Sequence, residues 1–293
     1  MPELPEVETL RRELEKAVKG KTIKSAQVKW PKMVLPKTPA EFQKKTKNKK
    51  ITDISRRAKV LIIALNDGNF LIIHLKLTGQ LIFRNKKSEI RNQKIAIGRG
   101  SQKGGVVGLP NKYTHVIFEF TDGSHLYFND LRKFGWVRLV SKVEVDKLLR
   151  EFGVEPLTKD FTLAKFKIIL KRYPNRKIKQ ILMDPSLISG IGNIYADESC
   201  FCAKILPTRP VKSLKPLEIK KLFLCIPKIL KFAIAKKGTS ADDYVQLDGQ
   251  PGDMVPYLKV YGRKGEKCKG CRGVVEKIKL NGRGTHFCRV CQK

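Results

Sequence analysis

The first two residues of the mature chain have the chemical types that covalent catalysis on a sugar requires. Methionine is generally removed when proline follows it, so we expect the chain to begin with the secondary amine of Pro2. An α-amino group titrates near about 7.7–8.0, so part of it is an uncharged nucleophile at cellular pH. Its attack on a sugar carbon gives an iminium ion that withdraws electrons, and Glu3 is the adjacent proton donor or acceptor. The alternative is an acidic helix start without chemistry.

Four cysteines near the C-terminus have the spacing of a metal site. They form two Cys-x2-Cys pairs with sixteen residues between them, Cys268, Cys271, Cys288 and Cys291. This pattern is typical of a tetrahedral structural Zn²⁺ site. Because the sequence begins without a secretory signal, we expect a reducing compartment that favours metal over disulfides. The remaining three, Cys200, Cys202 and Cys225, are expected to be buried free thiols.

The segment between the two cysteine pairs predicts a β-hairpin with a tight turn at Asn281-Gly282. Arg283 would then stand at the hairpin tip, where it is well placed to meet a phosphate. The alternative is a zinc ribbon that serves only stability or protein contact.

Two other motifs are suited to nucleic acid. Arg132 and Phe134 follow a predicted strand, and an apolar wedge beside an arginine can fill the space left by a base turned out of duplex DNA. The alternative is a loop arginine and a core phenylalanine. Asn193 begins a predicted helix after a glycine-containing turn, where its amide and the helix N-terminus are able to bind phosphate. Glycines between helices are also common without a ligand.

Four further residues are candidates only because the motifs above occur in the same chain. A leucine in a strand is normally core, single histidines are more often structural, and most basic clusters are solvated. The corresponding candidates for contact with DNA or its reacting sugar are Lys59, His74, Leu77 and His115.

The charge of the chain narrows the class of partner. It has 61 Lys and Arg against 27 Asp and Glu, a net charge of +34, which indicates a polyanion and above all nucleic acid. A membrane surface is the competing polyanion, but the sequence contains no long apolar span. A lysine-rich solvated surface would explain part of the excess.

Strand patterns dominate the first half of the chain and helical patterns the second. After a first helix with Pro5 in its first turn, β-rich runs separated by turns predict a β-sandwich or barrel. These runs cover residues 22–30, 51–55, 60–65, 70–77, 80–84, 113–120, 125–129 and 136–140. The predicted helices cover residues 143–152, 161–172, 178–183, 193–204 and 217–236, and Pro227 should kink the last. The Gly-rich segment 85–112 is expected to be a mobile surface loop.

Taken together, the motifs resemble those of bacterial formamidopyrimidine-DNA glycosylases, in the same order and over nearly the whole chain. The segments that carry the resemblance are Pro2-Glu3-Leu4-Pro5-Glu6-Val7-Glu8, Arg56-Arg57-Ala58-Lys59, His74-Leu75, Asn129-Asp130, Arg132-Lys133-Phe134-Gly135, residues 190–196, Tyr261-Gly262-Arg263-Lys264-Gly265-Glu266 and the four cysteines.

The resemblance implies an α+β multidomain fold with DNA bound in a cleft between the two halves. Its expected parts are an N-terminal catalytic β-sandwich domain, a linker, a helix-two-turn-helix domain and a four-cysteine finger holding one structural Zn²⁺. We place them at residues 1–141, 142–158, 159–258 and 259–293.

The resemblance also implies an activity: base-excision repair by a DNA-formamidopyrimidine glycosylase that is also a DNA-(apurinic or apyrimidinic site) lyase. Pro2 would be the nucleophile, Glu3 would protonate the opening sugar, Lys59 would assist, and Arg283 would hold the phosphate and serve the final elimination. Leu77, Arg132 and Phe134 would fill the duplex, while His74, His115 and Asn193 would hold phosphates. We expect a cytoplasmic, nucleoid-associated monomer whose partner is duplex DNA with oxidised bases.

The chain departs from the family pattern in two places. The family usually has methionine where Leu77 stands, so we expect function with an altered lesion preference. Segment 85–112 is longer than usual, and we interpret it as an extra phosphate contact that deletion of residues 91–108 would remove.

Segment 238–252, with Thr239, Ser240 and Tyr244, is expected to close over the everted base.

Two rival interpretations remain. One is the sister class that resembles endonuclease VIII and takes oxidised pyrimidines, although the residues after Pro2-Glu3 favour the purine branch. The other is a non-enzymatic zinc-ribbon protein that binds distorted nucleic acid, which gives no reason for Pro2, Glu3 and Lys59 to occur together.

Overall fold

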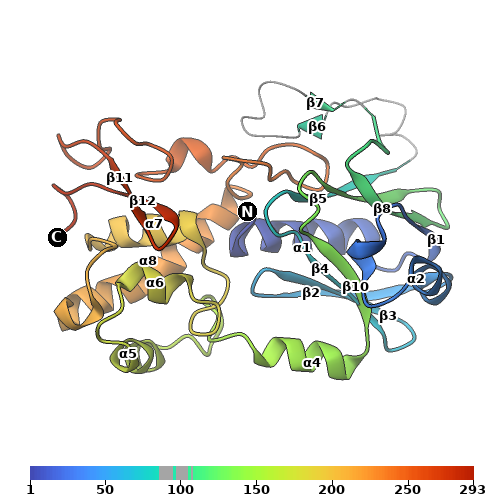
Figure 1. Cartoon of the computed structure of the whole chain (residues 1–293), viewed down its shortest axis with the longest axis horizontal. Coiled ribbons are helices and arrows are strands. Elements are labelled where there is room, and N and C mark those ends of the chain that lie inside the picture. The colour runs from blue at the N-terminus through green and yellow to red at the C-terminus, as the bar shows by residue number, and fades with distance from the viewer. Residues whose placement is uncertain (86–94, 97–104, 107) are drawn as a thin grey trace. The chain divides into compact units, whose positions relative to one another are not determined.

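The computed structural model describes the whole chain except residues 86–94, 97–104 and 107 (Figure 1). The described residues divide into two compact units. Unit 1 comprises residues 1–149 and 236–253, and unit 2 comprises residues 150–235 and 254–293. The segment 236–253, which the sequence prediction grouped with the helical domain, therefore packs with the N-terminal part of the chain.

Unit 1 contains two four-stranded antiparallel sheets in its described part. One has the order β1 (Ile23–Val28), β8 (Thr114–Phe120), β9 (His125–Asp130) and β5 (Gly79–Arg84). The other has the order β10 (Trp136–Val140), β4 (Phe70–His74), β3 (Val60–Leu65) and β2 (Ile51–Arg57). Both sheets contribute apolar side chains to one core, which includes Leu61, Leu71, Phe118 and Phe128. The predicted N-terminal β-sandwich is confirmed.

Helices complete unit 1. α1 (Leu4–Val18) buries Val7, Leu10 and Leu14 in the same core, as its helical spacing predicts. η1 (Pro31–Val34) and α2 (Pro39–Thr46) lie in the lysine-rich stretch for which no element was predicted. The signal for α2 was present, because Thr38 caps the helix by accepting from the Glu41 amide at 3.2 Å. α4 (Lys142–Arg150) follows β10.

Unit 2 is helical and ends in a hairpin. Its helices are α5 (Leu163–Arg172), α6 (Ile178–Met183), α7 (Asn193–Ala203) and α8 (Pro216–Ala235), with 3-10 turns η2 (Val211–Ser213) and η3 (Val255–Tyr257). α8 runs through Pro227 without interruption. The hairpin pairs β11 (Glu276–Leu280) with β12 (Arg283–Phe287). These elements confirm the predicted helices and hairpin.

One sequence prediction in unit 2 was wrong. Cys202 on α7 and Cys225 on α8 form a disulfide, with Cα atoms 5.8 Å apart, rather than two free thiols. The facing of two helices places these residues together, and the separation of 23 residues along the chain did not indicate it. Cys200 is a buried free thiol, as predicted.

Most of segment 85–112, and most of the proposed phosphate contact of residues 91–108, lies outside the described residues. Within it, β6 (Ile95–Ala96) pairs with β7 (Gly105–Val106). Among the helices that the structure describes, none combines the length and apolar character that crossing a bilayer requires.

Candidate functional site

The N-terminal residues lie at the start of α1. Pro2 is buried, and Glu3, the N-cap residue, has 2% of its surface exposed. The backbone amide of Glu3 donates to Glu6 Oε2 at 2.7 Å, while Glu6 Oε1 accepts from the Thr239 amide at 2.8 Å. Glu6 thereby connects Glu3, the residue next to the predicted nucleophile Pro2, to segment 236–253. Glu6 was not among the predicted site residues, although its place three residues after the N-cap Glu3 is the capping-box position.

Glycine is required where segment 236–253 meets Glu6. Gly238 has a positive φ of +84°, and a Cβ there would lie 2.9 Å from Glu6 Oε1 and from the Tyr244 ring. Tyr244 is buried in the core of unit 1, and its hydroxyl donates to the Lys237 carbonyl at 3.0 Å. Burial raises the pKa of Tyr244 well above its usual value, with the Glu6 charge adding to the effect, so the phenol stays protonated. The segment predicted to cover the base is thus anchored at Glu6 and Tyr244.

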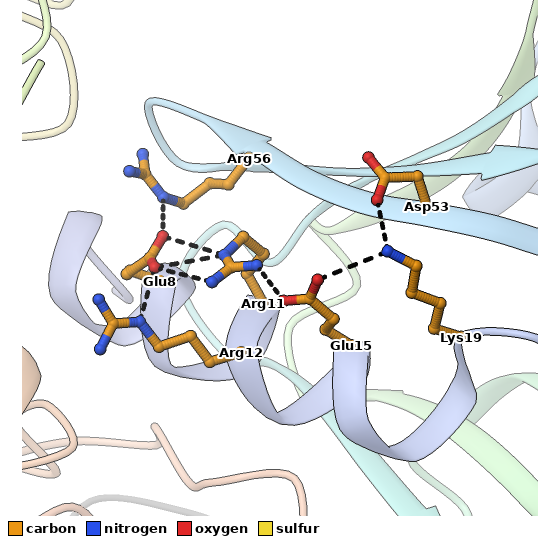
Figure 2. A network of polar contacts seen from close by, with 7 residues as sticks. All are labelled: Glu8, Arg11, Arg12, Glu15, Lys19, Asp53 and Arg56. Carbon is orange, nitrogen blue, oxygen red and sulfur yellow. Dashed lines mark hydrogen bonds and ion pairs between the residues drawn. The ribbon is translucent and has the colours of Figure 1, made fainter.

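A cluster of charges connects α1 to β2, the strand that leads into the turn with Lys59, and Figure 2 shows the charged side chains on these two elements. Glu8 accepts from Arg11, Arg12 and Arg56, and Arg56 also donates to the Ala58 carbonyl at 2.9 Å. Burial raises the pKa of Glu8, but the hydrogen bonds from the three guanidinium groups outweigh it and hold the pKa below its usual value. Ala58 adopts a positive φ of 53° in the turn between β2 and β3. Arg56, which belongs to the basic cluster noted in the sequence, is therefore a half-buried structural partner of Glu8.

The two predicted wedge segments link the sheets of unit 1. Residues 75–78 connect β4 to β5 and carry Leu77, which is half-buried. Residues 131–135 connect β9 to β10, and there Phe134 is 51% exposed with the Arg132 guanidinium 4.8 Å from its ring centroid. Phe134 is therefore not a core residue, which was the alternative interpretation.

The two candidate histidines have different hydrogen bonds. His74 Nδ1 accepts from the Lys76 amide at 2.9 Å, which leaves the proton of the neutral ring on Nε2. Burial, with the charges of Lys76 and Lys59, lowers the pKa of His74 to about 3. His115 is buried, and its Nε2 donates to the Asp130 carbonyl at 2.8 Å. A neutral His74 can donate to a phosphate from Nε2, whereas His115 would have to use Nδ1 in its protonated form.

The lowered pKa of His74 predicts a loss of stability in acid. The unfolded chain takes up a proton near pH 6.5 and the folded chain only near pH 3, so stability falls as pH drops through this window. At pH 5 the loss is about 2 kcal/mol. His74→Asn should remove this part of the pH dependence in urea unfolding at pH 7 and 5, whereas the control His125→Asn should keep it. Equal pH dependence in wild type and His74→Asn would contradict the assignment.

In unit 2, Asn193 and a buried ion pair hold the hairpin. Asn193 Nδ2 donates to the Gly284 carbonyl at 2.9 Å. Lys179 on α6 pairs with Asp197 on α7 at 2.6 Å, and Asp197 accepts from the His286 amide at 2.8 Å. Because the Asn193 side chain already binds the hairpin, its predicted phosphate contact would use the second Nδ2 hydrogen or the helix N-terminus.

Arg283 follows the tight turn that the sequence predicts. Asn281 and Gly282 both have positive φ, 47° and 74°, as a two-residue hairpin turn requires. Arg283 is exposed and borders a pocket of about 230 Å³ formed by α6 and the hairpin. The pocket is lined by Arg176, Lys179, Gln180, Met183, Asp184, Leu280, Asn281 and Arg283.

The four C-terminal cysteines converge. Their sulfur atoms all lie within 4.8 Å of one another, with Sγ–Sγ distances of 3.7 Å for Cys268–Cys291 and 3.5 Å for Cys271–Cys288. Zn–S bonds of about 2.3 Å in a tetrahedron require S–S distances of about 3.8 Å, so the thiols fit Zn²⁺. The Gly270 and Gly273 amides donate to Cys268 and Cys271 at 3.3 Å, which stabilises thiolates.

Comparison with known proteins identifies the family to which this chain is similar. Family models match three stretches of the chain: the formamidopyrimidine-DNA glycosylase N-terminal domain over residues 1–137, the H2TH domain over 152–244, and the zinc finger found in FPG and IleRS over 265–293. Curated formamidopyrimidine-DNA glycosylases of Listeria innocua and Enterococcus faecalis are each 39% identical over 295 residues. These alignments cover 100% of this chain and 100% and 98% of the relatives.

The chain belongs to the formamidopyrimidine-DNA glycosylase family. Solved structures agree: the Lactococcus lactis Fpg in complex with DNA containing an abasic site has a TM-score of 0.85 at 36% identity, covering 99% of both chains. The complex of that enzyme with Fapy-dG-containing DNA has a TM-score of 0.84 at 36% identity, covering 99% of this chain and 100% of the other. The α+β fold is that of the family.

As a member of the formamidopyrimidine-DNA glycosylase family, the chain carries one structural zinc ion at the four converging cysteines. The ion would hold the two ends of the finger together around the hairpin that presents Arg283. It supplies no reaction chemistry, because four thiolates fill its tetrahedral coordination.

Removal of zinc is expected to disorder the hairpin and weaken DNA binding by at least about 10²-fold, because metal binding drives the folding of such fingers. Elemental analysis should find one zinc per chain, and titration of duplex DNA after treatment with a chelator should show the loss. Cys271→Ser should reproduce it, while Cys200→Ala should keep the zinc because Cys200 lies apart on α7. Full DNA affinity in zinc-free protein would contradict this role.

Proposed function

We propose that this protein is a base-excision repair enzyme that removes oxidised purines from duplex DNA and then cleaves the abasic site. The proposal is carried by full-length similarity to formamidopyrimidine-DNA glycosylases together with Pro2 and Glu3 at the start of α1. Neither the charge nor the zinc finger alone distinguishes an enzyme from a binding protein. A secondary amine beside a carboxylate does, because it provides a nucleophile and a proton donor.

In the proposed reaction, the Pro2 nitrogen attacks the anomeric carbon of the damaged nucleoside. Glu3 protonates the ring oxygen as the sugar opens, and the base departs. The resulting iminium ion acidifies the adjacent sugar carbon, so β-elimination and then δ-elimination release both phosphates and leave a one-nucleotide gap. Lys59, in the turn between β2 and β3, is proposed to assist these steps. Arg283 is proposed to hold a phosphate and support the final elimination.

The proposed DNA contacts fall into two groups. Leu77, Arg132 and Phe134 fill the duplex after the base is turned out. His74, His115 and Asn193 contact phosphates, His74 as a neutral donor, and the net charge of +34 adds non-specific attraction. Segment 238–252 covers the everted base. We further propose that the protein acts as a monomer in the cytoplasm, in association with the nucleoid.

Borohydride trapping tests the function. The protein is incubated with a duplex that contains 8-oxoguanine opposite cytosine, and borohydride is added to reduce the iminium ion to a stable cross-link. We expect a covalent adduct and, without borohydride, a strand gap with phosphate ends. Tight binding without an adduct on this or any oxidised base would favour the binding protein. An adduct only with oxidised pyrimidines would favour the sister class. An adduct with both kinds of base would not, because a solved complex of the Lactococcus lactis Fpg also contains DNA with an oxidised pyrimidine.

A further inference from the structure

A buried carboxylate lies where the two wedge segments meet. Asp130, the last residue of β9, has 0% of its surface exposed. Its Oδ1 accepts from the Thr78 hydroxyl and from the Arg132 amide, the latter at 3.1 Å, and its Oδ2 accepts from the Gly135 amide at 2.6 Å. Among the described residues no lysine or arginine side chain pairs with Asp130. Its charge is therefore balanced by hydrogen bonds from the loops themselves.

These donors come from two of the connections between the sheets of unit 1. Thr78 belongs to the connection from β4 to β5, and Arg132 and Gly135 belong to the connection from β9 to β10. The Arg132 amide also donates to the Thr78 hydroxyl at 3.0 Å, which closes a triangle of hydrogen bonds. The strands on either side are paired in register, Gly79 with Asp130 and Trp136 with His74. Asp130 thus joins two segments that are far apart in sequence.

Close packing around this carboxylate leaves the loops little freedom. A Cβ on Gly135 would lie 3.0 Å from Asp130 Oδ2 and 2.7 Å from Phe128, and one on Gly79 would collide with the Leu75 carbonyl. Leu77 is the neighbour of Thr78, and Phe134 is the neighbour of Gly135. The residues that would enter the duplex are therefore one peptide unit from groups that Asp130 holds.

We infer that Asp130 is a positioning residue that makes Leu77, Arg132 and Phe134 one preorganised wedge. This inference rests on the proposed function, since it concerns how the wedge enters damaged duplex DNA. A loop that is ordered before binding loses less conformational entropy when it inserts. Without the carboxylate, the exposed Phe134 would sample many positions, and insertion with base eversion would become slow.

Two DNA substrates distinguish a positioning role of Asp130 from a general role in the stability of the fold. Base excision from an 8-oxoguanine duplex requires the wedge, whereas borohydride trapping on single-stranded DNA with an abasic site requires Pro2 but no displaced base pair. Asp130→Asn and Asp130→Ala are expected to slow single-turnover excision by about 10- to 100-fold, the effect of losing a charged hydrogen bond. Single-strand trapping should change less than about twofold, as for positioning rather than catalytic groups. Parallel loss on both substrates, or unchanged excision, would overturn the inference.

A binding measurement tests the positioning role of Asp130 without any catalytic step. A duplex with 2-aminopurine opposite a stable abasic-site analogue becomes brighter when a wedge unstacks the fluorescent base. Wild type should give a rapid rise and Asp130→Asn a slower one at saturating protein; equal rates would overturn the inference. If wild type traps on neither substrate, the proposed function fails, yet this measurement still tests the wedge.

Variants at neighbouring positions provide controls. Thr78→Val removes one donor and keeps the carboxylate, so it should slow the fluorescence rise in the same direction but less, and Thr78→Ser should restore it. Asp122→Asn is a matched control, because Asp122 Oδ1 accepts from the Ser124 amide at 3.0 Å in the turn between β8 and β9, away from the wedge segments. It should retain wild-type kinetics. A loss in Asp122→Asn equal to that in Asp130→Asn would overturn the inference.

Discussion

Pro2→Gly is expected to lose the borohydride cross-link and to reduce excision by at least about 10³-fold, because the secondary amine is the proposed nucleophile. A chain that retains Met1 should show the same loss. Its amine is displaced by one residue, about 3.8 Å along the backbone, and a near-attack geometry tolerates much less. Both chains should bind damaged duplex DNA with nearly wild-type affinity, since the wedge and the basic surface are unchanged.

Intact mass establishes which chains carry Met1, and trapping and gap formation are then compared at equal DNA occupancy. Pro5→Ala is the matched control, because Pro5 lies in the first turn of α1 and has no free amine. It should keep the cross-link. An adduct of undiminished yield from the Met1-bearing chain would refute the role of Pro2 and leave a lysine, with Lys59 the first candidate, as the nucleophile.

The second large effect is expected at the buried ion pair of unit 2. Lys179 and Asp197 have side chains that are 2% and 0% exposed, and Lys179 also donates to the Thr285 hydroxyl at 2.9 Å. Lys179→Met leaves the Asp197 carboxylate buried without its cation, which costs about 3–5 kcal/mol. The hairpin should detach from α6 and α7, and Arg283 would lose its fixed position.

Urea unfolding checks this prediction with two probes: tryptophan fluorescence, which reports on unit 1, and far-ultraviolet circular dichroism, which reports on the helices. Trp30 and Trp136, the two tryptophans of the chain, both lie in unit 1, whereas most helical residues lie in unit 2. Lys179→Met should shift the far-ultraviolet circular dichroism transition to lower urea concentration. Lys179→Met with Asp197→Asn should recover much of the loss, because asparagine can still accept from the His286 amide. The exposed control Lys171→Met should stay within about 0.5 kcal/mol of wild type. An unshifted transition in Lys179→Met would contradict the prediction.

Features that depend on neighbours in the chain could be predicted from the sequence. β3 and β10 have the predicted bounds, 60–65 and 136–140, because β-rich runs ended at turn residues on both sides. The cysteine pairs and the Asn281-Gly282 turn follow short-range rules of the same kind. α2 was not predicted, although Thr38 and Glu41 form a capping box, a short-range signal that is present in the sequence.

The positioning of the candidate site, in contrast, depends on residues far apart in sequence. Glu6 binds the amide of Thr239, 233 residues away, and Asp130 binds Thr78, 52 residues away. Cys202 meets Cys225 only because two helices face each other. Each of these partners has many equally suitable alternatives along the chain, so residue type alone does not select it.

By itself, then, the sequence determined the candidate chemistry: a proline amine beside a carboxylate, a four-cysteine zinc finger, and a basic chain suited to DNA. Only the tertiary structure decided which buried groups hold these parts in place. Glu6 orders the start of α1, Asp130 orders both wedge segments, and Lys179 with Asp197 orders the hairpin. The physical reason is that a buried carboxylate must find enough donors to offset its desolvation, and the folded chain alone brings those donors together.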